Sequence, residues 1–154
     1  MTRPWVLSHL SRVLLSARIR KNYFAIESSA SRSSYHENPD VSHRVFTKGE
    51  TKNVWGKSPE ILNTTLELEQ VVEKWREELR SAKPAPDVRL SDDVENFLCG
   101  FMYYASLVEM AKKGDGKRNV VFFHVPLFET EKDIRRGTEV TIALIKGLAE
   151  TSAG

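Results

Sequence analysis

The chain has 154 residues, of which 40% are hydrophobic and 29% are charged, and its net charge at pH 7 is +2. This length and composition fit one globular domain with a single core. The small net charge and the lack of a long basic run predict no nucleic-acid partner. No apolar run is long enough to span a bilayer, so we also expect no membrane partner.

The cysteine and histidine content limits the possible chemistry. One cysteine cannot form an internal disulfide, which favours a reducing compartment and predicts a cytoplasmic protein. One cysteine and four scattered histidines cannot build a structural zinc site, and no metal or other cofactor is implied.

Residues 1–22 form an atypical basic segment, and no acidic residue precedes Glu27. Apolar residues at positions 6, 7, 10, 13 and 14 predict a helix there. The composition also resembles a mitochondrial transit peptide, which is the minority alternative for localisation. A short amphipathic segment and an incorrect chain start are the other interpretations.

The middle of the chain predicts a strand at 23–26, a long polar loop at 28–57, and a helix that starts at Ser58 with Pro59 in its first turn. A second helix is predicted over 66–79, because its apolar residues recur at helical spacing.

The C-terminal half predicts a strand at 88–90, and then a helix with Ser91 as its N-cap. The apolar stripe expected for this helix is Val94, Phe97, Phe101, Tyr104 and Val108. Residues 120–125 predict a buried strand, as in the centre of a parallel sheet. Thr130 is expected to start a last helix that ends near Leu148, with these residues inward: Ile134, Thr138, Thr141, Ile142, Ile145 and Leu148. Alternating strands and helices predict an α/β fold with a mostly parallel sheet.

Cys99 and His124 suggest chemistry at one edge of this sheet. Cys99 lies near a predicted helix start, where the helix dipole favours a thiolate. His124 lies at the end of a predicted strand, where α/β sheets place their sites. A thiol and an imidazole are the minimum parts of a cysteine nucleophile with its general base, and Glu27 could orient the imidazole. Each residue alone has a structural interpretation: a small buried thiol, a core histidine and a surface glutamate.

These residues carry a resemblance to pyroglutamyl peptidase I, the pyrrolidone-carboxylate peptidases. The family's nucleophile segment has the form Ser-x-Asp-Ala-Gly-Arg-Tyr-Leu-Cys, followed by Tyr-Tyr-x-Ser-Leu. Phe97 stands where the family has Tyr, and the matching positions are Ser91, Asp93, Leu98, Cys99, Tyr103, Tyr104, Ser106 and Leu107. The family's Phe-x-His-Val-Pro segment, which carries the base, is matched by Phe122, His124, Val125 and Pro126.

The resemblance covers roughly residues 18–148. Glu27 follows a strand as the family's catalytic glutamate does, and residues 58–60 and 75–79 resemble fungal-type members. The resemblance implies a three-layer α/β/α fold, with residues 23–150 as the C-terminal portion of a pyroglutamyl-peptidase-like domain. It also implies a cysteine peptidase that removes N-terminal pyroglutamate from peptides, with Cys99 as nucleophile, His124 as base and Glu27 as the orienting carboxylate.

The sequence also departs from this family. The family begins with a strand and a Gly-Phe-x-Pro-Phe loop, which is implied to hold the pyroglutamyl ring, whereas the first glycine here is Gly49. We therefore expect an N-terminally truncated member with an incomplete sheet. Val94 and Glu95 replace an Ala-Gly pair before the nucleophile, which predicts bulk close to the thiol. The alternatives are an inactive member or incomplete gene product with a binding role, and an unrelated α/β interaction module.

Overall fold

The computed structural model describes residues 12–18 and 22–153. Within them, four strands form one mixed sheet: β1 (Arg12–Arg18), β6 (Val120–Pro126), β2 (Phe24–Glu27) and β5 (Val88–Ser91), in that spatial order. β1 is parallel to β6 and β2 is parallel to β5, whereas the central pair β2 and β6 is antiparallel. Two of the three strand pairings are therefore parallel, in agreement with the mostly parallel sheet predicted from the sequence.

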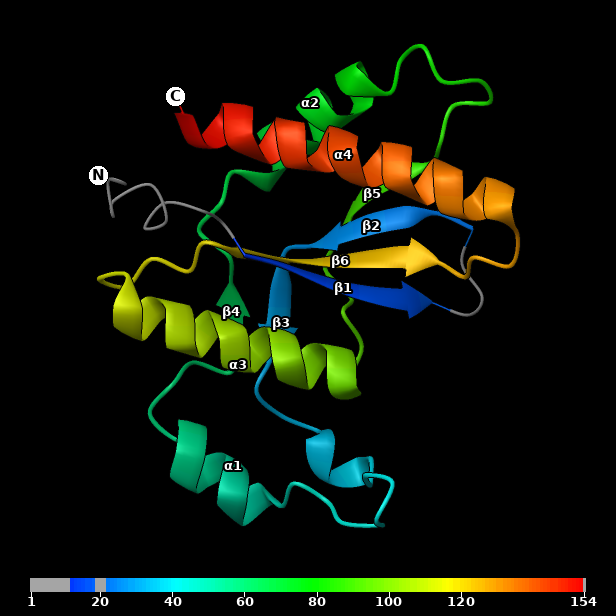
Figure 1. Cartoon of the computed structure of the whole chain (residues 1–154). Coiled ribbons are helices and arrows are strands. Elements are labelled where there is room, and N and C mark those ends of the chain that lie inside the picture. The colour runs from blue at the N-terminus through cyan, green and yellow to red at the C-terminus, as the bar shows by residue number, and fades with distance from the viewer. Residues whose placement is uncertain (1–11, 19–21, 154) are drawn as a thin grey trace, which may run out of the picture.

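Helices cover both faces of this sheet, which confirms the predicted three-layer α/β/α architecture (Figure 1). One face packs against α2 (Leu68–Glu78) and α4 (Glu131–Ala153), and the other packs against α3 (Leu98–Lys113). Beyond α3 lie α1 (Lys48–Trp55) and the short 3₁₀ helix η1 (Tyr35–Glu37), while β3 (Ser29–Ser31) and β4 (Ile61–Asn63) form a small antiparallel ribbon.

The side chains of β6 divide between two hydrophobic cores, because successive residues of a strand point to opposite faces. Val121, Phe123 and Val125 belong to the core under α2 and α4. Val120 and Phe122 belong to the core under α3. His124 follows the alternation of Phe122, so its ring lies on the α3 face of the sheet, where it contacts the Phe122 ring at a centroid distance of 4.9 Å.

Trp75 shows how the α2–α4 layer is fixed. Its side chain is fully buried and its indole Nε1–H donates to the carbonyl oxygen of Val140 in α4 at 2.8 Å. Its ring also meets Phe123 edge to face, at a centroid distance of 5.6 Å. One aromatic residue thereby joins α2, α4 and the central strand of the sheet.

The predicted elements at the N-terminus and in the long loop need correction. The predicted helix over 6–15 is wrong for residues 12–15, which belong to strand β1, and residues 6–11 lie outside the described part. The segment 28–57, predicted as a loop, contains β3, η1 and α1. The signal for α1 is a capping box between Thr47 and Glu50, in which each side chain accepts from the backbone N–H of the other residue.

Two predicted helix starts are also wrong. No helix begins at Ser58, because residues 61–63 pair with β3 and alternate exposed, buried and exposed. α3 begins at Leu98 and not at Ser91, which ends β5 and accepts a hydrogen bond from the backbone N–H of Asp93. Phe97 is 57% exposed and is therefore not part of the buried stripe.

The inward face of α4 differs from the one predicted. Leu148 is buried as predicted, but Ile134, Thr138, Ile142 and Ile145 face solvent, and the other buried apolar side chains are Val140, Ala143 and Leu144. Gly147 explains the reversal, because a Cβ at this position would come within 3.2 Å of the Val71 carbonyl oxygen and 3.3 Å of the Trp75 nitrogen. Small residues thus let α4 approach α2 closely, and the three isoleucines remain outside. Among the described residues, no helix has the length and apolarity needed to cross a membrane.

Candidate functional site

The antiparallel register of β2 and β6 brings two distant ionisable residues together. Ala25 lies opposite His124, and Glu27 lies opposite Phe122. Because side chains two residues apart share one face of a strand, Glu27 is the diagonal neighbour of His124 on the α3 face. The sequence prediction that Glu27 follows the strand at 23–26 is thus refined, since Glu27 is the last residue of β2 itself.

Glu27 and His124 form a buried polar pair. Nδ1 of His124 lies 2.8 Å from Oε1 of Glu27, where an Nδ1–H donates to the carboxylate. The side chains are 1% exposed for His124 and 0% for Glu27. A buried carboxylate is costly unless it is paired, so each residue stabilises the other in this position. The contact also orients the ring, since Nδ1 faces Glu27 and Nε2 is directed away from it.

Tyr103 connects this pair to α3. Its hydroxyl donates to the backbone carbonyl oxygen of Glu27 at 2.8 Å, and it lies 3.4 Å from that of Val120. Burial, together with the charge of the nearby Glu27 carboxylate, raises the pKa of Tyr103 far above its ordinary value. The phenol therefore remains a hydrogen-bond donor. Sequence reasoning placed Tyr103 in the family motif but did not predict this positioning role.

Cys99 is the second residue of α3, and its thiol is partly exposed. The prediction of a thiol near a helix start therefore holds, although the N-cap is Phe97 and lies six residues later than the predicted N-cap, Ser91. Figure 1 shows the first turn of α3 on the same side as the carboxyl ends of β1 and β6. The dipole of a 16-residue helix favours a negative charge at its first turn.

The turn that leads into α3 depends on residues 95 and 100. Glu95 adopts a φ of 66°, a left-handed conformation that glycine adopts easily and other residues adopt at a cost. Its side chain is exposed, whereas the neighbouring Val94 is buried. A Cβ on Gly100 would lie 2.2 Å from the Glu95 carbonyl oxygen and 3.2 Å from the Tyr35 hydroxyl, so only glycine fits directly after Cys99.

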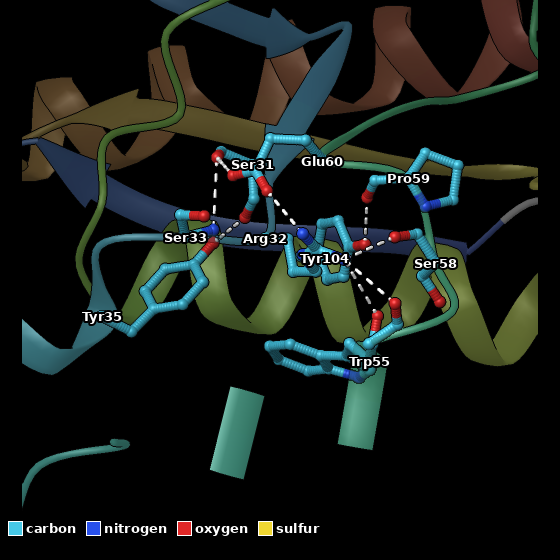
Figure 2. A network of polar contacts seen from close by, with 10 residues as sticks. Ser31, Arg32, Ser33, Tyr35, Trp55, Ser58, Pro59, Glu60 and Tyr104 are labelled. Atoms are coloured by element: carbon cyan, nitrogen blue, oxygen red, sulfur yellow. Dashed lines mark hydrogen bonds and ion pairs between the residues drawn. The ribbon is translucent and has the colours of Figure 1, made fainter. Parts of the chain in front are cut away.

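A polar network, which the sequence did not reveal, anchors the segment between β3 and β4 (Figure 2). Arg32 donates to the carbonyl oxygen of Ser58 at 2.8 Å and forms an ion pair with Glu60 at 3.0 Å. Hydrogen bonds from Ser33 and Ser31, together with the charge of Arg32, lower the pKa of Glu60. The network fixes the return of the chain from α1 to β4.

Tyr104, the neighbour of Tyr103, completes this second network. Its hydroxyl donates to the carbonyl oxygen of Pro59 at 2.5 Å (Figure 2). Tyr35 donates to the carbonyl oxygen of Ser31 and packs edge to face against Phe101, at a centroid distance of 5.3 Å. Adjacent tyrosines of α3 thus serve two different regions: Tyr103 holds the end of β2, and Tyr104 holds the start of β4.

Together, these features define a three-layer α/β protein with a buried carboxylate–imidazole pair on the sheet face that packs against a thiol-bearing helix. In the described part of the chain, no group of three or more His, Cys, Asp or Glu side chains is arranged to hold a metal ion. No family profile matches the sequence, and no curated protein matches it.

Solved structures of pyrrolidone-carboxylate peptidases share the fold. A mutant pyrrolidone carboxyl peptidase from Pyrococcus furiosus aligns with a TM-score of 0.61 and 18% identity, over 92% of this chain and 67% of that one. Pyroglutamyl peptidase I from Bacillus amyloliquefaciens aligns with a TM-score of 0.61 and 18% identity, over 92% of this chain and 64% of that one. The pyrrolidone carboxyl peptidase from Thermus thermophilus aligns with a TM-score of 0.62 and 22% identity, over 90% of this chain and 68% of that one. The chain therefore has the fold of these peptidases and spans about two thirds of their length.

The paired tyrosines allow a matched test of the positioning role of Tyr103. We expect Tyr103→Phe and Tyr104→Phe each to lower the free energy of unfolding by about 1 kcal/mol, because each removes one hydrogen bond to a backbone carbonyl. Only Tyr103→Phe should also change the alkylation rate of Cys99, since only Tyr103 joins α3 to the end of β2. Urea denaturation and iodoacetamide kinetics measure the two effects. If Cys99 is alkylated at the same rate in both variants, Tyr103 stabilises the fold but does not position the site.

A substitution at Glu95 is expected to stabilise the protein, whereas the two tyrosine substitutions destabilise it. Glu95→Gly should raise the free energy of unfolding by about 1 kcal/mol, because glycine adopts a φ of 66° without the steric cost of a Cβ. Glu50→Gly, inside α1, is the control and should be destabilising, since it removes the capping box. Thermal unfolding of the two variants checks both signs. A destabilised Glu95→Gly protein would show that the left-handed turn before α3 is not strained.

Proposed function

We propose that this chain is a cysteine peptidase of the pyroglutamyl type, with Cys99 as nucleophile, His124 as general base and Glu27 as the residue that orients the base. The observation that carries the proposal is the buried Glu27–His124 contact of 2.8 Å, on the face of the sheet that packs against α3. A carboxylate held against Nδ1 fixes the imidazole tautomer in which Nε2 accepts a proton.

The proposed reaction begins with proton transfer from the Cys99 thiol to Nε2 of His124. The thiolate then attacks the carbonyl carbon of the scissile amide, and the carbonyl oxygen takes the negative charge. As this tetrahedral intermediate collapses, the C–N bond breaks and the imidazolium gives its proton to the leaving amine. His124 then removes a proton from water, which hydrolyses the thioester and restores the thiol.

Glu27 contributes by stabilising the imidazolium that forms during each proton transfer. It does not itself need to take the proton, since its role is to fix the ring orientation and to supply a compensating charge. Cys99 lies in the first turn of α3, where backbone N–H groups point toward the helix start, so we assign the stabilisation of the developing oxyanion to this turn. The same N–H groups favour the thiolate before attack.

The substrate class follows from the likeness to pyroglutamyl peptidases and from the residues that match the family. A peptide with an N-terminal pyroglutamate is the proposed substrate, and the domain that acts on it is proposed to cover residues 23–150. The lone cysteine supports a reducing, cytoplasmic setting for a thiol of this kind. No cofactor takes part in the proposed steps.

One observation favours an inactive binding protein as the second candidate function. Glu95 holds a left-handed conformation at the position where the family motif has glycine. The sequence also contains no Gly-Phe-x-Pro-Phe segment, to which the family resemblance assigns the holding of the pyroglutamyl ring. A strained turn directly before the nucleophile would leave a protein that binds or positions peptides without efficient turnover.

The reactivity of Cys99 tests the catalytic machinery without a substrate. We expect an alkylation profile with an apparent thiol pKa below about 8.5, the ordinary value, because the helix dipole and the imidazole both favour thiolate. His124→Gln should move the profile back toward the ordinary value, while its amide can still donate to Glu27 and preserve the fold. The claim of an activated thiol fails if both proteins titrate at about 8.5.

The activity itself is expected to be weak. We expect the chain to cleave a chromogenic pyroglutamyl amide at least about a hundredfold more slowly than the Bacillus amyloliquefaciens enzyme, because a poorly held substrate seldom reaches attack geometry. The residual activity should disappear in Cys99→Ala. Turnover that persists in Cys99→Ala would contradict the proposed nucleophile, and fast Cys99-dependent turnover would show that the ring-binding loop is dispensable.

A further inference from the structure

A hollow lies between the segment 32–36 and the helix α1, two parts of the chain that Figure 1 shows beyond α3. Its volume of about 400 Å³ falls within the range of about 300–1,000 Å³ that is typical of small-molecule sites. No acidic side chain of the described residues lines it. The lining combines basic side chains with hydroxyl groups: His36, Lys48, Lys52, Ser33, Ser34 and Thr51.

The face of α1 that turns inward is polar along most of its length. Its last residue, Trp55, is buried and packs against Tyr104 at a ring centroid distance of 4.9 Å. Lys48, Thr51 and Lys52 precede Trp55 by seven, four and three residues, so they share its face of the helix, and all three line the hollow. A helix that packed only against protein would carry apolar residues at these positions.

The two lysines are placed where they disfavour the helix. Lys48 is the first residue of α1, where the positive end of the helix dipole repels a cation. Lys52 lies four residues later, and like charges at this spacing repel each other. Within residues 12–18 and 22–153, neither lysine forms an ion pair. An anion between them would turn both repulsions into attractions, so the arrangement suits a ligand better than it suits the fold.

The other two basic residues of the lining have different roles. Arg32 donates to the carbonyl oxygen of Ser58 at 2.8 Å and pairs with Glu60 at 3.0 Å, so its charge is already balanced and it supports the wall (Figure 2). Nε2 of His36 lies 3.7 Å from Oε1 of the exposed Glu37, which is too far for a hydrogen bond. The imidazole of His36 therefore keeps a ring nitrogen for a ligand.

We propose that this hollow binds a small molecule that bears a phosphate group, and that Lys48 and Lys52 hold the phosphate. Lysine binds phosphate oxygens through charge-assisted hydrogen bonds, and His36 supplies a further donor. Inorganic phosphate and phosphate esters share this chemistry. The volume leaves room for an organic group next to the phosphate, and the hydroxyl groups that can bind it belong to Ser33, Ser34 and Thr51.

The proposal does not rest on the peptidase activity. Cys99, His124 and Glu27 do not line the hollow, which is formed by the segment 32–36 and the helix α1. Loss of phosphate binding and loss of peptidase activity are thus separate observations.

Isothermal titration calorimetry of the whole chain, at constant ionic strength, tests the proposal with inorganic phosphate and with ribose 5-phosphate. We expect saturable binding that is at least about tenfold weaker in the Lys48→Gln/Lys52→Gln protein, which loses two charge-assisted hydrogen bonds. Lys113→Gln/Lys117→Gln removes the same charge outside the hollow and should bind normally. Tighter binding of ribose 5-phosphate would assign the site to phosphate esters, and equal affinities would assign it to free phosphate. No saturable binding of either compound, or equal weakening in the control, overturns the proposal.

Thermal unfolding separates a ligand-binding role of the lysines from a structural one. Without phosphate, the Lys48→Gln/Lys52→Gln protein should be at least as stable as the unsubstituted chain, because repulsion within α1 is removed. Ribose 5-phosphate should raise the Tm of the unsubstituted chain and leave that of the variant unchanged. A variant that is less stable without phosphate would show that the lysines serve the fold, which contradicts the proposal.

The histidine signals in ¹H–¹⁵N spectra locate the ligand. Titration with ribose 5-phosphate should shift the ring signals of His36, which lines the hollow. His43 is exposed and lies outside the lining, so its signals should stay in place. Unchanged His36 signals at saturation would place the phosphate elsewhere and overturn the proposed site.

Discussion

The buried contact between Glu27 and His124 is the constraint on which the rest of the site depends. It joins the two antiparallel strands at the centre of the sheet, and neither side chain reaches solvent. A shift of β2 by one residue would turn Glu27 toward the opposite core and leave the imidazole without its carboxylate. Removal of either partner would leave an uncompensated buried polar group, which is strongly destabilising. The pair therefore sets both the strand register and the orientation of the imidazole.

The layer above this pair is arranged around α3. Tyr103 holds the helix against the end of β2, while Tyr104, on the adjoining face, secures the start of β4. Gly100 lets the chain before the helix fold closely over its first turn, next to Cys99. One helix thereby holds the Cys99 thiol, and one strand pair holds the buried His124 imidazole. Helices and paired strands are rigid elements, which are suited to holding reacting groups.

The sequence located the strand that carries His124 better than it located the helix starts or the strand directions. The strand that carries His124 was located because a short apolar run leaves a clear local pattern, whereas the start of the helix that carries Cys99 was misplaced because Ser91 ends β5. The antiparallel pairing of β2 with β6 was not predictable, because strand direction depends on long-range connections that local patterns do not record. The α4 prediction failed at its inner face, where glycines allow close packing and isoleucines lie outside. Tyr103 was visible in the motif, but only the fold shows that its hydroxyl reaches Glu27.

The tautomer of His124 is the most direct test of the central claim. Long-range ¹H–¹⁵N correlation spectra of the labelled protein distinguish a proton on Nδ1 from a proton on Nε2. We predict that neutral His124 carries its proton on Nδ1, donated to Glu27, and that Glu27→Gln perturbs this preference. A neutral imidazole with its proton on Nε2 would contradict the account, because that nitrogen could not accept the proton of the Cys99 thiol.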